Sequence, residues 1–261
     1  MKRICYTTFI ATSLCQILIS KPIALFYALD NDWRQFASSA DSVPKQVKIG
    51  GSNAEKVKIG DFEIYGLKMG SGPVNTAASS QSLISSTPIE FAISIGPVGS
   101  LSNDLPVGST VLIEQVIPWQ TVPDISVASP QSFTHYTPIN MPGDWSSLLK
   151  GYTPAKAASG EQFINQSSLR SDIHTATDAD VVEMNLYGLL VVLQNQNIPS
   201  LHPRIVSDLA NEDANDEFVS FRSTYNGSLG KLIADILKAP PSDPTDPDSY
   251  PELKQLFQGK N

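Results

Sequence analysis

The sequence has only two cysteines, Cys5 and Cys15, and both lie within its first twenty residues. The rest of the chain has none, which excludes a disulfide framework and a cysteine nucleophile there. Histidine is also scarce: His135, His174 and His202 are the only three, and no two are spaced as metal ligands on one helix would be. We therefore expect neither a metal ion nor another cofactor.

Charged residues are few, at 17% of the chain against roughly 25% in an average soluble protein. Eighteen Lys and Arg residues stand against 26 Asp and Glu residues, which gives a formal net charge of -8. Such an acidic chain has no basic surface for a phosphate backbone or for anionic lipids, so we expect neither nucleic acid nor a membrane as a partner. The Gly-x-Ser-x-Gly motif of α/β serine hydrolases does not occur either.

The first twenty residues have the pattern of a secretory signal peptide. A basic start, Met1-Lys-Arg3, precedes an uncharged run from Ile4 to Ile19, which is polar in places and short for a membrane span of ~20 apolar residues. We expect a secreted or periplasmic protein whose leader, residues 1–20, is removed near Ser20. Cleavage at the other candidate position, Ala28, would remove the first predicted strand. The alternative is a buried first strand that follows an unusual leader.

After the leader, segments with strand and helix patterns alternate along the chain. Apolar runs predict strands at residues 22–28, 62–69, 91–95, 110–113, 180–184 and 204–207. Helical spacing and capping residues predict helices at residues 30–38, 74–85, 144–149, 186–195 and 218–237. Residues 39–58 suit a loop or a β-hairpin, and we expect Gly96 and Pro97 to end the strand at 91–95. This alternation predicts an α/β fold with a largely parallel sheet. The acidic, Pro-rich residues 239–261 are expected to form a C-terminal tail.

A glycine-rich turn, Gly70-Ser-Gly72-Pro73, lies between a predicted strand and a predicted helix, as a dinucleotide-binding fingerprint would. Asn75 stands where the third small residue belongs, and Glu90 precedes its strand instead of following it. These departures favour a tight turn without a dinucleotide. The backbone amides at the start of the helix remain suited to an anion or a polar ligand.

Two acids follow predicted strands at the edge where open α/β sheets bind their ligands. Asp208 comes directly after the strand at 204–207, and Asp32 lies just beyond the strand at 22–28. Each alone is most simply a helix cap or a surface charge. Two carboxylates in one cleft could instead divide the work, with one protonated as an acid and the other ionised to orient a nucleophile.

Three longer motifs occur in the order Ser159-Gly-Glu-Gln-Phe-Ile164, Val182-Glu-Met-Asn185 and Arg204-Ile-Val-Ser-Asp208-Leu-Ala210. Their order and spacing resemble those of the nucleoside phosphorylase and nucleosidase superfamily, most closely the methylthioadenosine/S-adenosylhomocysteine nucleosidases. Weaker similarities precede them at residues 28–32, 70–74 and 95–99. The resemblance covers residues 22 to 237, which is nearly the whole chain behind the leader.

The resemblance implies a single α/β domain over residues 21–238, with a twisted, mixed, mostly parallel central sheet flanked by helices and with a tendency to form homo-oligomers. It also implies cleavage of the N-glycosidic bond between a purine and ribose, with water or phosphate as nucleophile. In the matching positions, Asp208 would protonate the purine. Asp32, one methylene shorter than the family's Glu, would orient the water.

The remaining matching positions imply contacts with the substrate. Phe163 would stack on the base and Ile164 would bind it through the backbone, while Glu183 and Met184 would border the ribose. Two further positions that imply substrate contacts are Asn185 and Ser207.

Two departures from the family pattern bear on activity. Asn185 replaces a Glu that grips the ribose hydroxyls, and Pro97 offers no amide hydrogen to the nucleophile pocket. No arginine near Gly70 or Gly96 suggests a phosphate site, which favours hydrolysis over phosphorolysis. The sequence predicts an exported purine nucleosidase. The alternative is a nucleoside-binding member of the same family that is non-catalytic or phosphorolytic.

Overall fold

The computed structural model describes residues 21–141, 145, 149 and 151–239. Its strands are β1 (Lys21–Tyr27), β2 (Lys45–Ile49), β3 (Ser52–Ile59), β4 (Phe62–Lys68), β5 (Phe91–Ser100), β6 (Thr110–Pro118), β7 (Thr153–Ser159), β8 (Val181–Glu183), β9 (Ser200–Leu201) and β10 (Pro203–Asp208). Its helices are α1 (Asp30–Ser38), α2 (Pro73–Ser86), α3 (Ser167–Thr177), α4 (Leu186–Asn195), α5 (Ala214–Thr224) and α6 (Ser228–Lys238). The expected leader, most of the helix expected at 144–149 and the tail after residue 239 lie outside the described residues.

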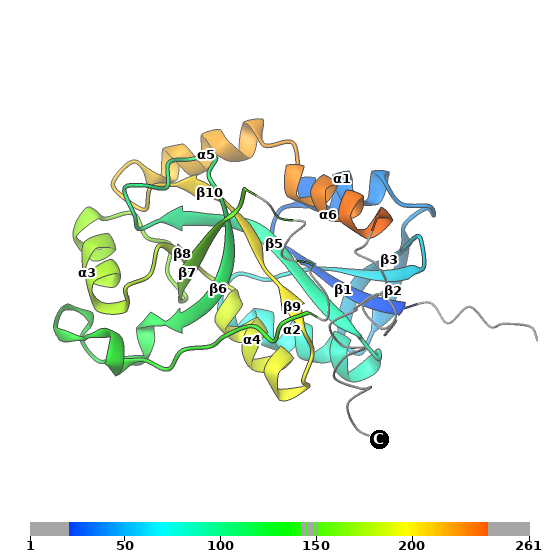
Figure 1. Ribbon diagram of the computed structural model, residues 1–261, viewed down its shortest axis with the longest axis horizontal. Coiled ribbons are helices and arrows are strands. Elements are labelled where there is room, and N and C mark those ends of the chain that lie inside the picture. Colours follow the sequence, from blue (N-terminus) through cyan, green and yellow to red (C-terminus); the bar gives the residue numbers. More distant parts are fainter. Residues whose placement is uncertain (1–20, 142–144, 146–148, 150, 240–261) are drawn as a thin grey trace, which may run out of the picture.

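The strands form one mixed sheet in which parallel pairings predominate, as predicted (Figure 1). β1 lies between β4 and β5 and is parallel to both, and the hairpin of β2 and β3 extends the sheet beyond β4. β5 also pairs with β8 and with β10. Because β10 pairs with β6, β6 with β7 and β7 with β8, these five strands close into a ring. The sequence did not predict this closure.

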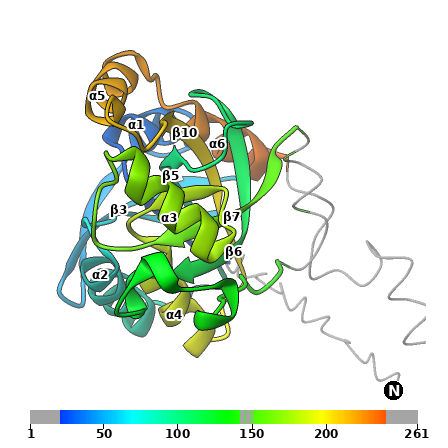
Figure 2. The same cartoon turned by 90° about the vertical axis from the view of Figure 1, so that its left-hand side faces the viewer.

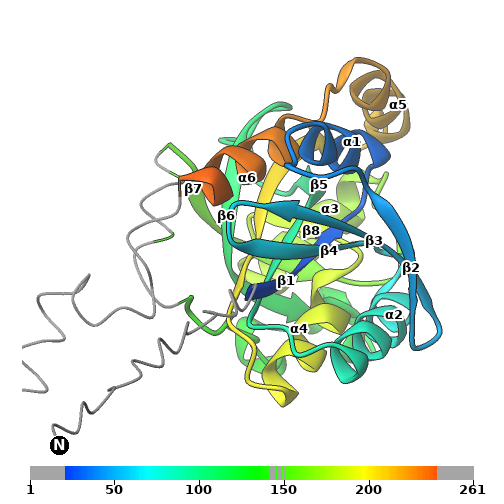
Figure 3. The same ribbon diagram turned by 90° about the vertical axis from the view of Figure 1, so that its right-hand side faces the viewer.

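Helices cover both faces of the sheet around β1 (Figure 3), with α1 and α6 on one face and α2 and α4 on the other. The residues of β1 alternate between these two layers. Ile23 and Leu25 pack with the core under α1 and α6, while Ala24 and Phe26 pack with the core under α2 and α4. A strand that is buried on both faces has no polar position, which explains its continuous apolar sequence.

Several boundaries differ from the prediction, and two of them have a clear structural cause. β5 does not end at Gly96 and Pro97 but continues to Ser100, because Pro97 pairs in parallel register with Ile205 of β10. The helix predicted at 218–237 is two helices, since α5 ends at Thr224 and α6 begins after Gly227. Gly227 has a φ of 82°, which interrupts a helix and which glycine adopts without strain.

β7 and α3 were not predicted from the sequence. β7 lies in the ring and consists largely of small residues, so it lacks the bulky apolar run that marks the other strands. α3, which faces the viewer in Figure 2, packs Ile173 and Ala176 against a third core cluster that includes Ile117 of β6 and Ala158 of β7. Among the described residues, no helix combines the length and the apolar character needed to cross a bilayer.

Candidate active site

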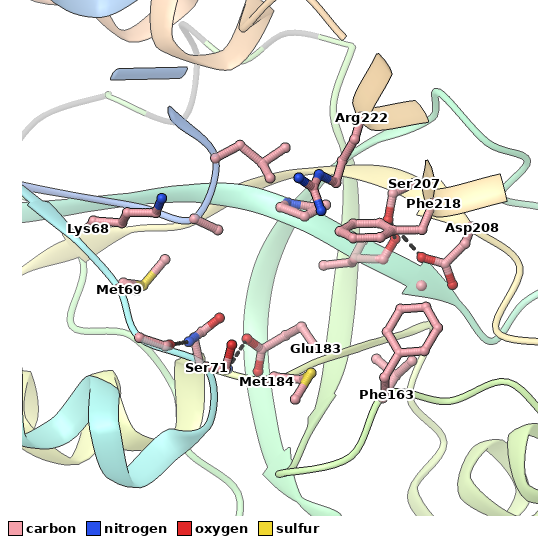
Figure 4. A pocket seen from close by; sticks show the side chains of 18 of the residues that line it. Lys68, Met69, Ser71, Phe163, Glu183, Met184, Ser207, Asp208, Phe218 and Arg222 are labelled. Carbon is pink, nitrogen blue, oxygen red and sulfur yellow. Dashed lines mark hydrogen bonds between the residues drawn. The ribbon is translucent and has the colours of Figure 1, made fainter. Parts of the chain in front are cut away.

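A cavity of about 610 Å³ opens where β1, β4 and β10 end and where β5 passes into the ring. Its volume lies within the range of ~300–1,000 Å³ that is typical of small-ligand pockets. Seven of the eight predicted site residues line it: Phe163, Ile164, Glu183, Met184, Asn185, Ser207 and Asp208. Figure 4 labels Phe163, Glu183, Met184, Ser207 and Asp208 among them. The fold therefore brings together side chains from three motifs that are separated in the sequence.

Asp208 is the last residue of β10 and is only 2% exposed. Its Oδ2 accepts a hydrogen bond from the Ser207 hydroxyl at 2.8 Å, and its Oδ1 accepts one from the Ala210 amide at 3.1 Å. Burial raises the pKa of Asp208 above its ordinary value, and the charge of Glu217 acts in the same direction, while the two hydrogen bonds oppose them. A carboxyl group in this setting can hold a proton and deliver it to a ligand.

Glu183 ends β8 and is 6% exposed, with one carboxylate oxygen engaged and the other free. Its Oε2 accepts hydrogen bonds from the amides of Asn185, at 2.6 Å, and Leu186, at 2.9 Å. Its buried Oε1 has no hydrogen-bond partner in the part of the chain that the structure describes. A buried acceptor without a hydrogen-bond partner costs free energy. This oxygen is therefore well suited to accept a hydrogen bond from a hydroxyl group of a ligand or from a water molecule.

The side-chain amide of Asn185 forms hydrogen bonds with residues just before and at the start of α2. Its Nδ2 donates to the Gly70 carbonyl and to the Thr76 hydroxyl, the latter at 2.7 Å. The amide hydrogens are therefore directed to the protein and not to the cavity. Whatever Asn185 offers a ligand comes from its carbonyl oxygen.

The aromatic side of the cavity consists of two phenylalanines from different elements. The ring centroid of Phe163, which precedes α3, lies 5.8 Å from that of Phe218 on α5, with a tilted geometry. The guanidinium of Arg222, one turn further along α5, lies 5.7 Å from the Phe218 ring centroid. Phe218 and Arg222 were not predicted as site residues. Phe163 lines the cavity, and its role as a ring that stacks on a base stays a prediction.

Asp32 does not line this cavity, and the expectation that it shares a pocket with Asp208 is wrong. Its side chain is fully buried beneath α6, where Oδ1 accepts hydrogen bonds from the Tyr225 hydroxyl at 2.6 Å and from the Gly230 amide at 3.3 Å. Because successive residues of a helix point in different directions, Asp30 and Asn31 face the cavity while Asp32 faces α6.

The close approach of α1 and α6 explains why Asp32 is sealed off from the cavity. A Cβ atom on Gly230 would lie 1.8 Å from the backbone oxygen of Asp32, so only glycine permits this spacing. Burial raises the pKa of Asp32 from 3.8 to about 6, against the lowering effects of Tyr225, Gly230 and the charge of Arg204. Asp32 is therefore a buried acid within the helical layer.

We predict that Asp32→Asn stabilises the protein at pH 7. Between pH 3.8 and about 6 the native state binds more protons than the unfolded state, so this group lowers stability as the pH rises through that window. The shift corresponds to at most about 3 kcal/mol at pH 7. Urea unfolding at pH 4.5 and pH 7 should show a gain for the variant at pH 7 alone. Asp104→Asn, at an exposed position outside the cavity, is the matched control. A loss of stability at pH 7 would mean that the Asp32 charge is needed.

Arg204 is a buried cation that affects the pKa values of two buried acids, Glu183 and Asp32. No role was assigned to it from the sequence. It is 1% exposed on β10, and its guanidinium donates to the backbone oxygen of Ser94 and, at 2.7 Å, to the Ser94 hydroxyl. Its positive charge lowers the pKa of Glu183 and of Asp32, in each case against the larger effect of burial. One buried cation thus stabilises the charge of a cavity residue and of a residue beneath α6.

The glycine-rich turn is occupied by a side chain of the protein itself. The carboxylate of Glu161 accepts a hydrogen bond of 3.5 Å from the Val74 amide in the first turn of α2. Glu161 therefore places a negative charge at this end of α2, next to the predicted anion site at the amides. Gly70, Ser71 and Pro97 line the cavity, the last without an amide hydrogen to offer.

The described residues contain no group of three or more His, Cys, Asp and Glu side chains that could hold a metal ion. His202, predicted to be structural, is fully buried and its Nε2 lies 2.9 Å from the Ser200 hydroxyl.

The fold and the cavity define an α/β protein with a cavity of small-ligand size at the carboxyl ends of its parallel strands. A family model described as the phosphorylase superfamily matches residues 22–238, and the chain belongs to this superfamily. The resemblance found in the motifs is thus confirmed.

Known relatives agree with this assignment. The chain is 26% identical over 235 residues to the 5′-methylthioadenosine/S-adenosylhomocysteine nucleosidase of Listeria monocytogenes, which covers 83% of this chain and 98% of the relative. The structure of the same nucleosidase from Helicobacter pylori is similar, with a TM-score of 0.75, 19% identity and coverage of 84% of this chain and 99% of that chain. Futalosine hydrolase of H. pylori gives a TM-score of 0.71 at 19% identity, with coverage of 84% and 97%. The predicted fold is therefore confirmed.

Proposed function

We propose that this protein is a purine nucleosidase, which hydrolyses the N-glycosidic bond of a purine nucleoside. The observation that carries the proposal is the shared cavity of Asp208, Phe163 and Glu183. These residues supply a buried acid, an aromatic surface for a base and a free acceptor oxygen for a hydroxyl or a water. The nucleosidases among the curated relatives support the same reaction.

In the proposed mechanism, Phe163 stacks on the purine and Asp208 protonates a ring nitrogen, so that the base leaves as a neutral molecule. The bond between the sugar carbon and the base nitrogen breaks as positive charge develops on the sugar ring, as in glycoside hydrolysis generally. Water, oriented by a carboxylate, then bonds to that carbon and gives a proton to that carboxylate. Since Asp32 is sealed beneath α6, we assign the water-orienting role to Glu183, whose Oε1 is unpartnered.

Chromatographic detection of free base tests this function. Adenosine, inosine, guanosine, methylthioadenosine and uridine are offered, each with and without phosphate. We expect release of a purine base without phosphate and no release of uracil. Release that requires phosphate would make the protein a phosphorylase, and binding without release would make it a non-catalytic nucleoside-binding member of the family.

We also propose that the protein is exported and that its leader is cleaved near Ser20. The central place of β1 supports a site before this strand, because β1 pairs with both β4 and β5. Cleavage after Ala28 would remove this central strand. Sequencing the N-terminus of the secreted protein tests the proposal, and sedimentation of the same sample tests the homo-oligomer that the family resemblance implies.

A further inference from the structure

The proposed base and sugar contacts leave one end of the cavity unused. In Figure 4, Lys68 lies on the opposite side of Glu183 from Asp208. Lys68 is the last residue of β4, and the start of α1 completes this end of the cavity with Asp30 and Arg34.

This end of the cavity is cationic. Lys68 forms an ion pair of 2.7 Å with Asp30, in which both side chains are more than half exposed. Arg34 lies four residues after Asp30 on α1, so the two side chains share one face of the helix and Arg34 stands one turn away from the ion pair. No ion pair of Arg34 is found among the described residues. Arg222 adds a third cation to the cavity wall, beside Phe218.

At this end Lys68 and Arg34 stand against one acid, Asp30, and a third cation lies on the cavity wall, whereas the chain as a whole has a net charge of -8. The only other acids that line the cavity are Glu183 and Asp208, and both are buried at the base and sugar positions. The exposed pair with Asp30 contributes little to stability. An arriving anion can therefore share Lys68 with Asp30.

Resting on the proposed nucleosidase function, we propose that the preferred substrate carries an anionic group, a phosphate or a carboxylate, on its 5′ carbon, and that Lys68 and Arg34 bind it. The base and the 5′ carbon leave the ribose ring on opposite sides of the ring oxygen. With the base against Phe163 and the carbon that bears it next to the water on Glu183, the 5′ carbon is directed toward Lys68, which lies beyond Glu183 in Figure 4. A phosphate ion acting as nucleophile would instead lie against the carbon that bears the base.

Titration calorimetry of the full protein tests the proposal with adenosine, adenosine 5′-phosphate, adenosine 5′-carboxylic acid and inorganic phosphate. One of the two 5′ anions should bind at least about tenfold more tightly than adenosine, which is the effect of one charge-assisted hydrogen bond. The preference should shrink as salt is added, because these cations are exposed. Equal or weaker binding of both anions would overturn the proposal. So would binding of inorganic phosphate as tight as that of the 5′-phosphate.

Variants that remove single charges test which residues cause the preference for the anionic ligand. Lys68→Gln and Arg34→Gln should each reduce the preference for the anionic ligand several-fold, whereas Asp30→Asn should increase it. Lys48→Gln, at an exposed position of β2 outside the cavity, is the matched control and should keep the preference. Unchanged preferences in both Lys68→Gln and Arg34→Gln would overturn the assignment of these residues.

The two proposals fail in different ways. If the 5′ anions bind more tightly but no ligand releases base, the nucleosidase function fails and the anion site stands. If adenosine releases base and binds as well as the anions do, the function stands and the anion site fails.

Discussion

Asp208→Asn should lower kcat/KM for release of a purine base by about 10²–10⁴-fold, the usual contribution of a general acid. Asparagine has nearly the same shape as aspartic acid but has no acidic proton to give to the base. In the variant, the side-chain oxygen of the asparagine can still accept a hydrogen bond from the Ala210 amide. Its side-chain NH₂ group can donate to the Ser207 hydroxyl, which can in turn donate to the backbone oxygen of Val98, 3.1 Å away. The fold should therefore persist. Free base is measured by chromatography, and near-ultraviolet circular dichroism verifies the fold.

Asp32→Asn is the matched control for this experiment, because it makes the same chemical change at a buried acid that does not reach the cavity. It should retain base release within a few-fold. The pH profile gives a second control, since a general acid works only while protonated. Activity of the unmodified protein should fall as the pH rises through the pKa of Asp208, which burial raises above its ordinary value. A folded Asp208→Asn protein with full activity would exclude the acid role.

The sequence predicted elements well where the signal was local. α1 and α4 have the predicted bounds, because the apolar spacing of a helix depends on neighbours within one or two turns. β5 was predicted too short, since the pairing that carries it past Pro97 comes from β10, more than a hundred residues later. The closed ring has the same cause, because it depends on contacts between distant strands that no local pattern records.

The sequence predicted which motifs form the site, but it did not predict where each side chain points. Seven of its residues lie in one cavity because the motifs lie at the ends of neighbouring strands. Asp32 was misplaced because the direction of a helical side chain depends on the rotation of that helix against α6, which Gly230 sets by close contact. Lys68 was overlooked although a signal existed, since it stands at the carboxyl end of a predicted strand. Arg204 belongs to a predicted motif but had no predicted role, because its hydrogen-bond partner Ser94 is distant in the sequence.

Arg204→Met should destabilise the protein by about 3–5 kcal/mol, because it leaves two buried carboxylates without a nearby positive charge and removes the guanidinium's hydrogen bonds to Ser94. Burial lowers the pKa of Arg204 to about 10, against the attraction of Glu183 and Asp32, so the guanidinium is charged at pH 7. Methionine would leave Glu183 and Asp32 without their shared counter-charge and would remove two hydrogen bonds to Ser94. Urea unfolding at pH 7 measures the loss. Arg170→Met, at a half-buried arginine that bonds to a backbone oxygen, is the control and should cost far less.

Two further variants keep this prediction testable if Arg204→Met does not fold. Arg204→Lys keeps the charge but loses the planar fork, so it should cost less than the methionine variant. Adding Asp32→Asn to Arg204→Met should recover part of the lost stability, because one of the two unpaired carboxylates is then neutral. An additive double variant would show that Asp32 does not depend on Arg204. In that case the cation serves Glu183 alone, and the link between the cavity and the layer beneath α6 disappears.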